Sequence, residues 1–399
     1  MKILHVIAQL PAATGSGVYF SKVISEYKAR NIDQAAIFGQ PKGYRWKLIP
    51  KTYPVTFGLD LDFPIVGMSD VMPYESTRYR DLTKEQVDQW KGVFRKRLEQ
   101  AIHEFQPDVI LTHHTWLLSA LVVEIFDGPV YGFCHNTDLR QRKINPHFAT
   151  DLAPLQKIDG VFTSGKSEHY ELIYDFGIVE KKLHPLGGAY DSEIFHSKGR
   201  VESDKIRYTY AGKLCDTKGT LELIDAFIAL KDKNTELNLI GKAIGDMEER
   251  IYDRIKGHKN ISLLPPVTQK ELGDHFRRQD IFILPSYYEG MPLSPIEALA
   301  CGCSVIMTEN DNLKDLVGNS ILDCGWIDFL DMPRLRGIDE IHPEAREDFI
   351  QVLKESMKKQ QQWKNVLPGE EVRREIESHS WTGLVNQIQE IILREQDIL

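Results

Sequence analysis

The chain has 399 residues, of which 42% are hydrophobic and 27% are charged. At roughly 150 residues per domain, this length predicts two compact domains, each with a core of its own. The net charge of -9 argues against a nucleic acid-binding protein, because such proteins concentrate lysine and arginine on one face. We therefore expect no nucleic acid among the partners of this protein.

The cysteines and the apolar segments indicate the cellular compartment. The five cysteines form neither a Cys-x-x-Cys pair nor a zinc-like spacing with histidine, so we interpret them as reduced, mostly buried thiols. The N-terminal run Met1–Ala8 contains His5 and leads into a glycine-containing loop, which is typical of a core strand and not of a signal peptide. No apolar stretch approaches the roughly 18 residues of a membrane span. We expect a cytoplasmic protein whose only membrane contact would be peripheral, at the inner face.

Short apolar runs alternate with longer amphipathic stretches throughout the chain, which is the pattern of parallel-sheet α/β domains. In the first half the expected strands are Ile3–Leu10, Gln34–Phe38, Asp108–Thr112, Val130–Cys134 and Val161–Thr163. In the second half they are Tyr208–Ala211, Leu237–Ile240, Ile261–Leu264, Ile281–Leu284 and Ser304–Met307. Each half can therefore form a doubly wound sheet of its own.

A glycine-rich loop follows the first strand and opens a helix. Gly15, Ser16 and Gly17 place backbone amides where they could face a phosphate or a sugar. The dinucleotide fingerprint is incomplete, because Phe20 occupies the third glycine position and the next strand ends at Phe38–Pro41 without an acidic residue. The loop therefore predicts a phosphate or sugar contact and not a dinucleotide site.

Three further segments define the organisation of the chain. The region 42–83 lacks clear periodicity and is rich in proline, glycine and tyrosine, so we expect an insertion of strands and loops there. A helix is predicted over Val87–Phe105, where apolar residues recur at helical spacing. Such a stripe is typical of core packing, and a membrane-surface helix is the alternative. The turn-rich stretch His184–Arg200 contains three glycines and is the expected domain boundary.

The strand Tyr208–Ala211 leads into a glycine turn at Gly212 and then into a helix start. Lys213 and Lys218 flank this loop, and both ammonium groups could reach one anionic ligand at the carboxyl edge of the sheet, where doubly wound folds bind ligands. Two lysines are also common on a solvated loop. They gain significance from the residues expected beside them at the same edge.

The strand Ile281–Leu284 leads through a tight loop at Glu289 and Gly290 into a short helix. Ser294 is the expected N-cap of this helix and Glu297 stands at the capping-box position, so Glu297 has a structural explanation. Glu289 has no such explanation. It stands at the carboxyl end of a central strand, and the helix start behind it offers free amides to a diphosphate. The two carboxylates and the two lysines together indicate a ligand site.

Together these segments resemble glycosyltransferase family four. The family pattern of a glycine and a basic residue, then Lys-Gly, then Glu-x7-Glu, a glycine and an apolar strand is matched by Gly212-Lys213, Lys218-Gly219, Glu289 to Glu297, Gly302 and Val305-Ile306. The resemblance extends over nearly the whole chain to Ser380-Trp381 and a last helix over Leu384–Leu393, and it is looser in the N-terminal half. Lys213 replaces the commoner arginine, and Cys303-Ser304 stands where Lys-Pro is more usual.

The resemblance implies an α/β protein of the GT-B fold, with two Rossmann-like, doubly wound parallel-sheet domains facing a cleft. We expect an acceptor-binding domain over 1–190, a linker over 191–200, a nucleotide-sugar-binding domain over 201–375 and a C-terminal helix over 376–399 that crosses back to the first domain. The implied activity is retaining, metal-independent glycosyl transfer, with a hexosyltransferase and a polysaccharide pathway favoured. A UDP-sugar is favoured over a GDP-sugar as donor substrate, without a further cofactor. The acceptor stays open among glycans, lipid-linked sugars and small molecules.

The same resemblance assigns roles to residues. Lys213 and Lys218 would bind the donor diphosphate, Glu297 the ribose hydroxyls and Glu289 the hydroxyls of the transferred sugar. The catalytic residues would be His135, Glu289 and Lys218. The donor site would comprise Gly15, Ser16, Gly17, Gly212, Lys213, Lys218, Pro266, Val267, Glu289, Gly290, Met291, Leu293, Ser294 and Glu297.

Weaker candidates for contact with the acceptor are His113, His114, Asp138 and Arg140. Arg140 belongs to a basic cluster with Arg142 and Lys143, for which the alternatives are an anionic acceptor, lipid head groups or a solvated loop. Two other functions stay open, namely a nucleotide-sugar epimerase of the same fold and a non-catalytic sugar-nucleotide-binding protein. Epimer formation without an acceptor would identify the first, and donor hydrolysis would argue against the second.

Overall fold

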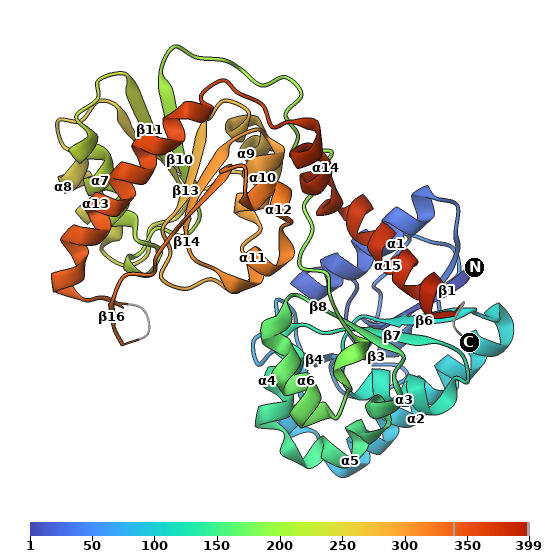
Figure 1. The fold of residues 1–399 in the computed structure, drawn as a ribbon. Helices are drawn as coiled ribbons and strands as arrows, with labels where there is room; N and C mark the ends of the chain where they lie inside the picture. Colours follow the sequence, from blue (N-terminus) through green and yellow to red (C-terminus); the bar gives the residue numbers. More distant parts are fainter. Residues whose placement is uncertain (338–339, 397–399) are drawn as a thin grey trace. The chain divides into compact units, whose positions relative to one another are not determined.

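The computed structural model describes residues 1–337 and 340–396 of the chain. These residues form two compact units, drawn in Figure 1. The first unit comprises Met1–Gly187 and the chain from Val385, and the second unit comprises Gly188–Leu384. The change from one unit to the other after Gly187 falls inside the turn-rich stretch 184–200.

The first unit is built on a seven-stranded parallel sheet in the order β3-β2-β1-β6-β7-β8-β9. Its strands are β1 (Lys2–Ile7), β2 (Asp33–Pro41), β3 (Val55–Phe57), β6 (Val109–Thr112), β7 (Val130–Phe133), β8 (Gly160–Thr163) and β9 (Leu183–Pro185), and the short strands β4 (Val66–Gly67) and β5 (Thr77–Arg78) pair with each other. Its helices are α1 (Gly15–Ala29), α2 (Lys84–Phe105), α3 (Leu117–Ile125), α4 (Asn136–Ile144), α5 (Ala149–Leu152) and α6 (His169–Phe176). The strand order reverses between β1 and β6, which is where a doubly wound sheet offers a ligand site.

The second unit repeats this organisation on a six-stranded parallel sheet in the order β12-β11-β10-β13-β14-β15. Its strands are β10 (Ile206–Ala211), β11 (Thr235–Ile240), β12 (Ile261–Leu264), β13 (Ile281–Leu284), β14 (Ser304–Thr308) and β15 (Ile327–Leu330), and β16 (Leu335–Arg336) pairs with β17 (Glu340–Ile341). Its helices are α7 (Thr220–Leu230), α8 (Met247–Ile255), α9 (Gln269–Phe276), α10 (Ser294–Ala300), α11 (Asp311–Leu316), α12 (Asn319–Leu322), α13 (Pro343–Gln360) and α14 (Glu370–Ser378). The predicted doubly wound, Rossmann-like organisation is therefore confirmed in both units.

The expected strands appear because parallel strands covered on both faces consist of uninterrupted apolar runs. Every residue of β13 and β14 is buried. Every predicted strand is present, and the first one ends at Ile7, with Ala8–Leu10 in the loop that follows. The edge strands β9 and β15 were not predicted, because polar and partly exposed residues interrupt their apolar runs. The boundary predicted at His184–Arg200 contains the change between the two units, and its first residues, His184 and Pro185, still belong to β9.

Helix α2 decides between the two interpretations of its apolar stripe. It begins at Lys84 and not at Val87, because Thr83 and Gln86 form a capping box in which each backbone N–H donates to the other side chain. The stripe lies buried in the core of the first unit through Trp90, Phe94, Leu98, Ala101 and Phe105. Core packing is therefore confirmed, and the membrane-surface alternative is wrong.

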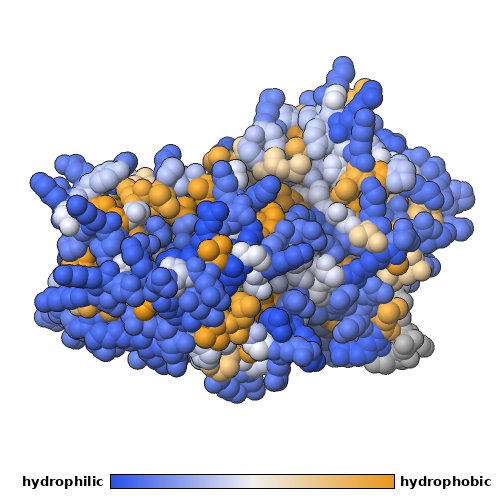
Figure 2. All heavy atoms as spheres, turned by 90° about the horizontal axis from the view of Figure 1, so that it is seen from above, coloured by the Kyte–Doolittle hydropathy of each residue, from blue (hydrophilic) through white to orange (hydrophobic). Residues whose placement is uncertain are grey.

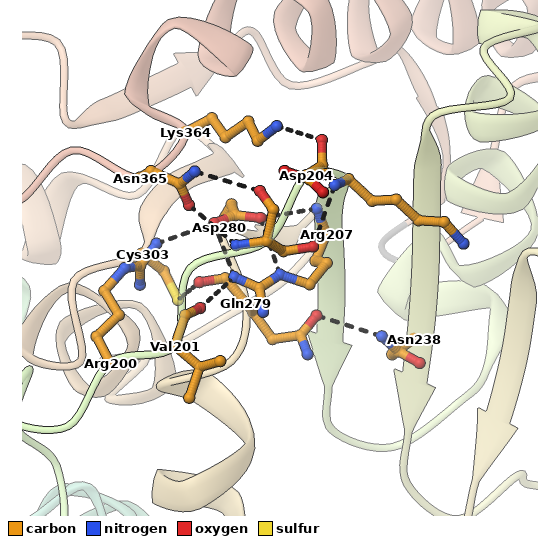
Figure 3. A network of polar contacts seen from close by, with 12 residues as sticks. Arg200, Val201, Asp204, Arg207, Asn238, Gln279, Asp280, Cys303, Lys364 and Asn365 are labelled. Atoms are coloured by element: carbon orange, nitrogen blue, oxygen red, sulfur yellow. Dashed lines mark hydrogen bonds and ion pairs between the residues drawn. The ribbon is translucent and has the colours of Figure 1, made fainter.

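A buried ion network anchors the start of the second unit (Figure 3). Asp280, fully buried just before β13, accepts hydrogen bonds from Arg207 Nε at 3.1 Å and from Arg200 Nη2 at 3.2 Å. Arg207 also donates its backbone N–H to Asp280 at 2.9 Å. These contacts lie at the amino ends of β10 and β13, opposite the edge where ligands bind. We assign the network a structural role, because removing one partner would leave a buried charge uncompensated.

The last helix, α15 (Trp381–Gln396), starts in the second unit and belongs to the first unit from Val385 onward. There Tyr131 Oη donates a hydrogen bond to Glu395 at 2.9 Å, and Glu395 also lies 3.2 Å from His184 Nε2. The chain thus returns to the first unit at its end.

Hydrophilic residues cover most of the face shown in Figure 2, and apolar residues form scattered patches among them. Within residues 1–337 and 340–396, no helix combines the length and the hydrophobicity that crossing a membrane requires. All five cysteines are free thiols, and Cys134, Cys301 and Cys303 are buried, as the sequence predicts.

Candidate functional site

In the second unit, glycine allows the loops after β10 and β13 to meet. Gly219 has a φ of +60°, and a Cβ atom there would lie 2.4 Å from the carbonyl oxygen of Pro285. Any larger residue would therefore push the two loops apart. The backbone N–H of Tyr287 donates to the carbonyl oxygen of Thr217 at 2.9 Å and holds the loops together. This close approach places Lys218 beside the loop that carries Glu289.

Lys218 and Glu289 form an ion pair. Lys218 Nζ donates hydrogen bonds to Glu289 Oε1 at 2.7 Å and to the carbonyl oxygen of Tyr288 at 3.1 Å. The two side chains are 20% and 22% exposed, so an incoming ligand can reach both. The structure thus brings two of the predicted catalytic residues into direct contact.

Lys213 follows Gly212, whose backbone packs closely against Gly241 at the end of β11. A Cβ atom on Gly241, whose φ is +151°, would lie 1.7 Å from the carbonyl oxygen of Gly212. The carbonyl oxygen of Lys213 accepts a hydrogen bond from Tyr210 Oη at 2.6 Å, which fixes its backbone. The Lys213 side chain is exposed and makes no ion pair within the described residues. Its ammonium group is therefore available to an anion.

The expected capping box at Glu297 is wrong. Helix α10 begins at Ser294, and Leu293 occupies the N-cap position with helical backbone angles and without a side-chain cap. Because the backbone of Ser294 is already helical, its hydroxyl does not cap the helix. Glu297 is only 9% exposed, and among the described residues its carboxylate has no hydrogen-bond partner. Burial raises the pKa of Glu297 to about 7.

The Glu297 side chain is largely buried, and its carboxylate makes no hydrogen bond or ion pair within the described residues, so Glu297 loses its structural explanation and becomes a candidate for ligand contact. Of the other residues predicted beside it, Gly290, Met291 and Leu293 follow Glu289 in the same loop and Ser294 begins α10, and all four are partly exposed. Pro266 and Val267 lie exposed after β12.

Two asparagines that the sequence analysis missed hold the Glu289 loop. Asn310 Nδ2 donates to the carbonyl oxygens of Glu289 at 3.0 Å and of Gly290 at 3.2 Å. Asn312 Nδ2 also donates to the carbonyl oxygen of Gly290, at 3.2 Å. Both residues follow β14, so asparagines after a central strand were the signal that could have identified them.

The first unit contains a pocket of about 360 Å³ beside the glycine loop. Three of the predicted residues, Gly15, Ser16 and His135, line it. Gly17 does not line it, and its donor contact stays a prediction. A Cβ atom on Gly17 would lie 2.7 Å from the carbonyl oxygen of Leu10, so this glycine permits close packing of the start of α1. The other residues that line the pocket are Gln9, Thr14, Tyr19, Met68, Ser69, Met72, Asn136 and Thr137.

Gln9, a second residue that the sequence analysis missed, organises the glycine loop. Its Nε2 donates to Ser16 Oγ at 2.7 Å and to Thr14 Oγ1 at 3.1 Å. Thr14 in turn caps α1 by accepting a hydrogen bond from the backbone N–H of Gly17 at 3.0 Å. This chain of contacts fixes one side of the pocket.

Asp138, buried in the first turn of α4, holds the side of the pocket that carries His135. Its carboxylate accepts hydrogen bonds from the backbone N–H groups of Thr115 at 3.0 Å and His135 at 2.9 Å, and it pairs with His114 Nδ1 at 2.6 Å. Asp138 is fully buried, with both oxygens engaged. Its predicted contact with the acceptor is therefore wrong, because the carboxylate has no free face to offer.

The histidines differ in their access to solvent. His113 is fully buried and stacks on Phe133 with ring centroids 4.7 Å apart, and His114 is 6% exposed. Neither lines the pocket, and their contact with an acceptor stays a prediction. His135 does line the pocket, and its Nε2 has no hydrogen-bond partner in the described part of the chain. Burial lowers the pKa of His135 to about 4, so the ring is uncharged near neutral pH.

The basic cluster on α4 is largely structural. Arg142 Nε donates to the carbonyl oxygen of Asp175 at 3.1 Å, and Lys143 pairs with Glu171 at 2.9 Å, so both tie α4 to α6. Arg140 is exposed and lies outside the pocket lining.

Known proteins resemble this chain in sequence and in fold. The family described as glycosyl transferases group 1 matches residues 191–327. A Bacillus subtilis glycosyltransferase named for teichuronic acid biosynthesis, TuaC, is 34% identical over 345 residues, covering 80% of this chain and 83% of the relative. D-inositol 3-phosphate glycosyltransferase of Pseudarthrobacter chlorophenolicus is 26% identical over 190 residues, so the match spans only 44% of that relative's length and 44% of this chain.

The crystal structure of Anabaena HepE in complex with UDP has a TM-score of 0.63 at 14% identity, covering 99% of this chain and 100% of that one. At this identity the likeness concerns the fold, which is the GT-B fold of glycosyltransferases. The extended match to TuaC establishes the family: the chain belongs to the group 1 glycosyltransferases.

Proposed function

We propose that this protein is a retaining, metal-independent glycosyltransferase of family four, which moves a sugar from a nucleotide-diphosphate sugar to a hydroxyl acceptor. The observation that carries the proposal is the arrangement at the carboxyl edge of the second sheet. The Lys218–Glu289 ion pair, the free ammonium of Lys213 and the largely buried side chain of Glu297 belong to the same two strand-end loops and the helix that follows.

The charges of these residues match the parts of a nucleotide sugar. Lys213 and Lys218 would stabilise the diphosphate as it leaves. Glu297 would accept hydrogen bonds from the ribose hydroxyls, which would satisfy its carboxylate. Glu289 would hold hydroxyls of the transferred sugar while its negative charge favours the positively charged sugar centre of the transition state. A single well-placed electrostatic contact of this kind typically contributes about two to three orders of magnitude in rate.

In this proposal the acceptor hydroxyl attacks the anomeric carbon on the face from which the diphosphate departs. The anomeric configuration is therefore retained. The acceptor hydroxyl would lose its proton to an oxygen of the leaving phosphate, so that no protein base is required for that step. His135, uncharged near neutral pH, would exchange a hydrogen bond with a sugar hydroxyl through its free Nε2. Because TuaC is named for teichuronic acid biosynthesis, a glycan is our first choice of acceptor.

Thermal unfolding in the presence of UDP, GDP, ADP and their glucose conjugates tests the donor site. A nucleotide at about 100 times its dissociation constant should add roughly 2.7 kcal/mol of stability. Lys218→Ala should weaken this effect. Lys205→Ala is the matched control, because it breaks the ion pair with Glu236 beside the opposite end of β10. If no nucleotide shifts the unfolding transition, the proposed donor site is wrong.

The alternatives give different products. An epimerase would convert the donor sugar to its epimer without an acceptor, and a binding protein would leave the donor intact. Slow hydrolysis of the donor with release of the nucleoside diphosphate is the outcome expected of a transferase.

A further inference from the structure

The pocket beside the glycine loop of the first unit is lined without a charged side chain. Hydroxyl and amide groups come from Ser16, Ser69, Asn136 and Thr137, and apolar surface comes from Met68 and Met72. This combination suits a sugar ring, whose hydroxyl groups need hydrogen-bond partners and whose C–H faces pack against apolar side chains.

The charges nearest the pocket are already compensated or lie outside it. Asp138 stands in the first turn of α4, where its buried carboxylate offsets the partial positive charge of the helix end. The ring of His135 is uncharged near neutral pH. Arg140 is exposed one turn further along α4 and does not line the pocket.

Two helix starts contribute backbone amides to the lining, α1 at Gly15 and Ser16 and α4 at Asn136 and Thr137, and Asp138 offsets the second. A helix end corresponds to a partial charge of about +0.5, whereas a phosphate monoester carries nearly two negative charges at neutral pH. Taking those charges out of water without a cationic partner is costly. The lining therefore disfavours a phosphorylated ring and favours an uncharged one.

The apolar wall of the pocket is held in place by buried amide side chains. Gln141 Nε2 donates to the carbonyl oxygen of Met68 at 3.0 Å, and Asn145 Nδ2 donates to Gln141 Oε1 at 2.6 Å. Gln141 and Asn145 are 4% and 0% exposed. Because Gln141 belongs to α4, which also carries Asn136 and Thr137, the polar and apolar sides of the pocket are fixed to one another. The pocket is thus formed before a ligand enters.

From this geometry we infer that the pocket of the first unit receives an uncharged sugar ring of the acceptor, so that the enzyme glycosylates neutral glycosides in preference to sugar phosphates. The inference deepens the proposed function and rests on it for the identity of the acceptor. It separates this chain from relatives such as the D-inositol 3-phosphate glycosyltransferase, whose name specifies a phosphorylated acceptor.

Ligand-observed saturation-transfer NMR on the full chain tests the inference. The probes are the methyl glycosides of glucose, galactose, mannose and N-acetylglucosamine and the 6-phosphates of the same sugars, each with and without UDP. We expect at least one methyl glycoside to bind about tenfold more tightly than its 6-phosphate. Thr137→Lys should improve binding of the 6-phosphates about tenfold, because a charge-assisted hydrogen bond becomes available. Gln100→Lys adds the same charge on the exposed face of α2. This control should change neither the affinity for the methyl glycosides nor the affinity for the 6-phosphates.

Equal or tighter binding of the 6-phosphates by the wild-type protein would overturn the inference. So would a failure of every methyl glycoside to bind in samples where UDP still raises the unfolding temperature, and this result would leave the proposed function intact. If no nucleotide shifts the unfolding temperature, the proposed donor site fails instead. The samples without UDP then still decide whether the pocket prefers neutral rings.

Discussion

Replacing Glu297 by glutamine should stabilise the second unit above neutral pH. The carboxyl is 9% exposed, and burial raises its pKa from 4.5 to about 7. One pKa unit corresponds to about 1.36 kcal/mol, so the ionised form costs the folded state about 3 kcal/mol. A group with a raised folded-state pKa contributes stability that is fully present below pH 4.5 and is lost as the pH rises through 7. Glutamine cannot ionise, so Glu297→Gln should match the wild type near pH 4 and exceed it by about 3 kcal/mol at pH 8.

The assay is urea unfolding between pH 4 and pH 8.5, followed by hydrogen exchange of peptides from β13 and β14, which report on the second unit. Glu168→Gln is the matched control in the first unit, because burial also raises the pKa of Glu168 to about 7. That variant should alter the pH dependence of the stability of the first unit. It should leave the hydrogen exchange of peptides from the second unit unchanged. A Glu297→Gln variant no more stable than the wild type at pH 8 would refute the assignment of a buried, unpartnered carboxylate.

The same substitution tests the ribose contact. A hydrogen bond from a ribose hydroxyl to a carboxylate is charge-assisted and stronger than one to an amide. We therefore expect the affinity of the wild-type protein for UDP-glucose to rise between pH 5.5 and pH 7.5 as Glu297 ionises. Glu297→Gln should bind about tenfold more weakly at pH 8 and show little pH dependence. Unchanged affinity at pH 8 would remove Glu297 from the donor site.

Substitutions at three positions address the remaining assignments. Lys218→Ala should lower sugar transfer about 100- to 1,000-fold, because the ammonium held by Glu289 is lost, and wild-type turnover in a radiolabelled-donor assay would contradict its role. For His135→Ala we expect a loss of turnover while nucleotide binding in the thermal assay is largely kept; unchanged turnover would reduce this histidine to a structural residue. Asp138→Ala should lower the free energy of unfolding by about 3 kcal/mol or more, because its three N–H partners would be left buried and unpaired. Asp138→Asn should lower the free energy of unfolding less, since an amide oxygen can still accept hydrogen bonds from both backbone N–H groups. Equal stability of the two variants in urea would exclude the loss of these hydrogen bonds as the cause.

The sequence by itself determined the central strands of both sheets. Continuous apolar runs such as Ile281–Leu284 occur where a parallel strand is covered on both faces, and that property is local enough to be recognised in a few residues. The helical spacing of apolar residues likewise defined α2, although its start at Lys84 depended on a capping box that periodicity does not reveal. Lys218 and Glu289 could be assigned to one edge, because the carboxyl ends of parallel strands meet there.

Tertiary structure alone decided what surrounds each polar side chain. Glu297 fitted a capping box in the sequence, and only the helical backbone of Leu293 and the burial of the carboxylate removed that explanation. Asp138 looked available to an acceptor, but segments from two different strand ends converge on it. Secondary structure follows from neighbours along the chain, whereas burial, ion pairing and the resulting pKa depend on residues distant in sequence that only folding brings together.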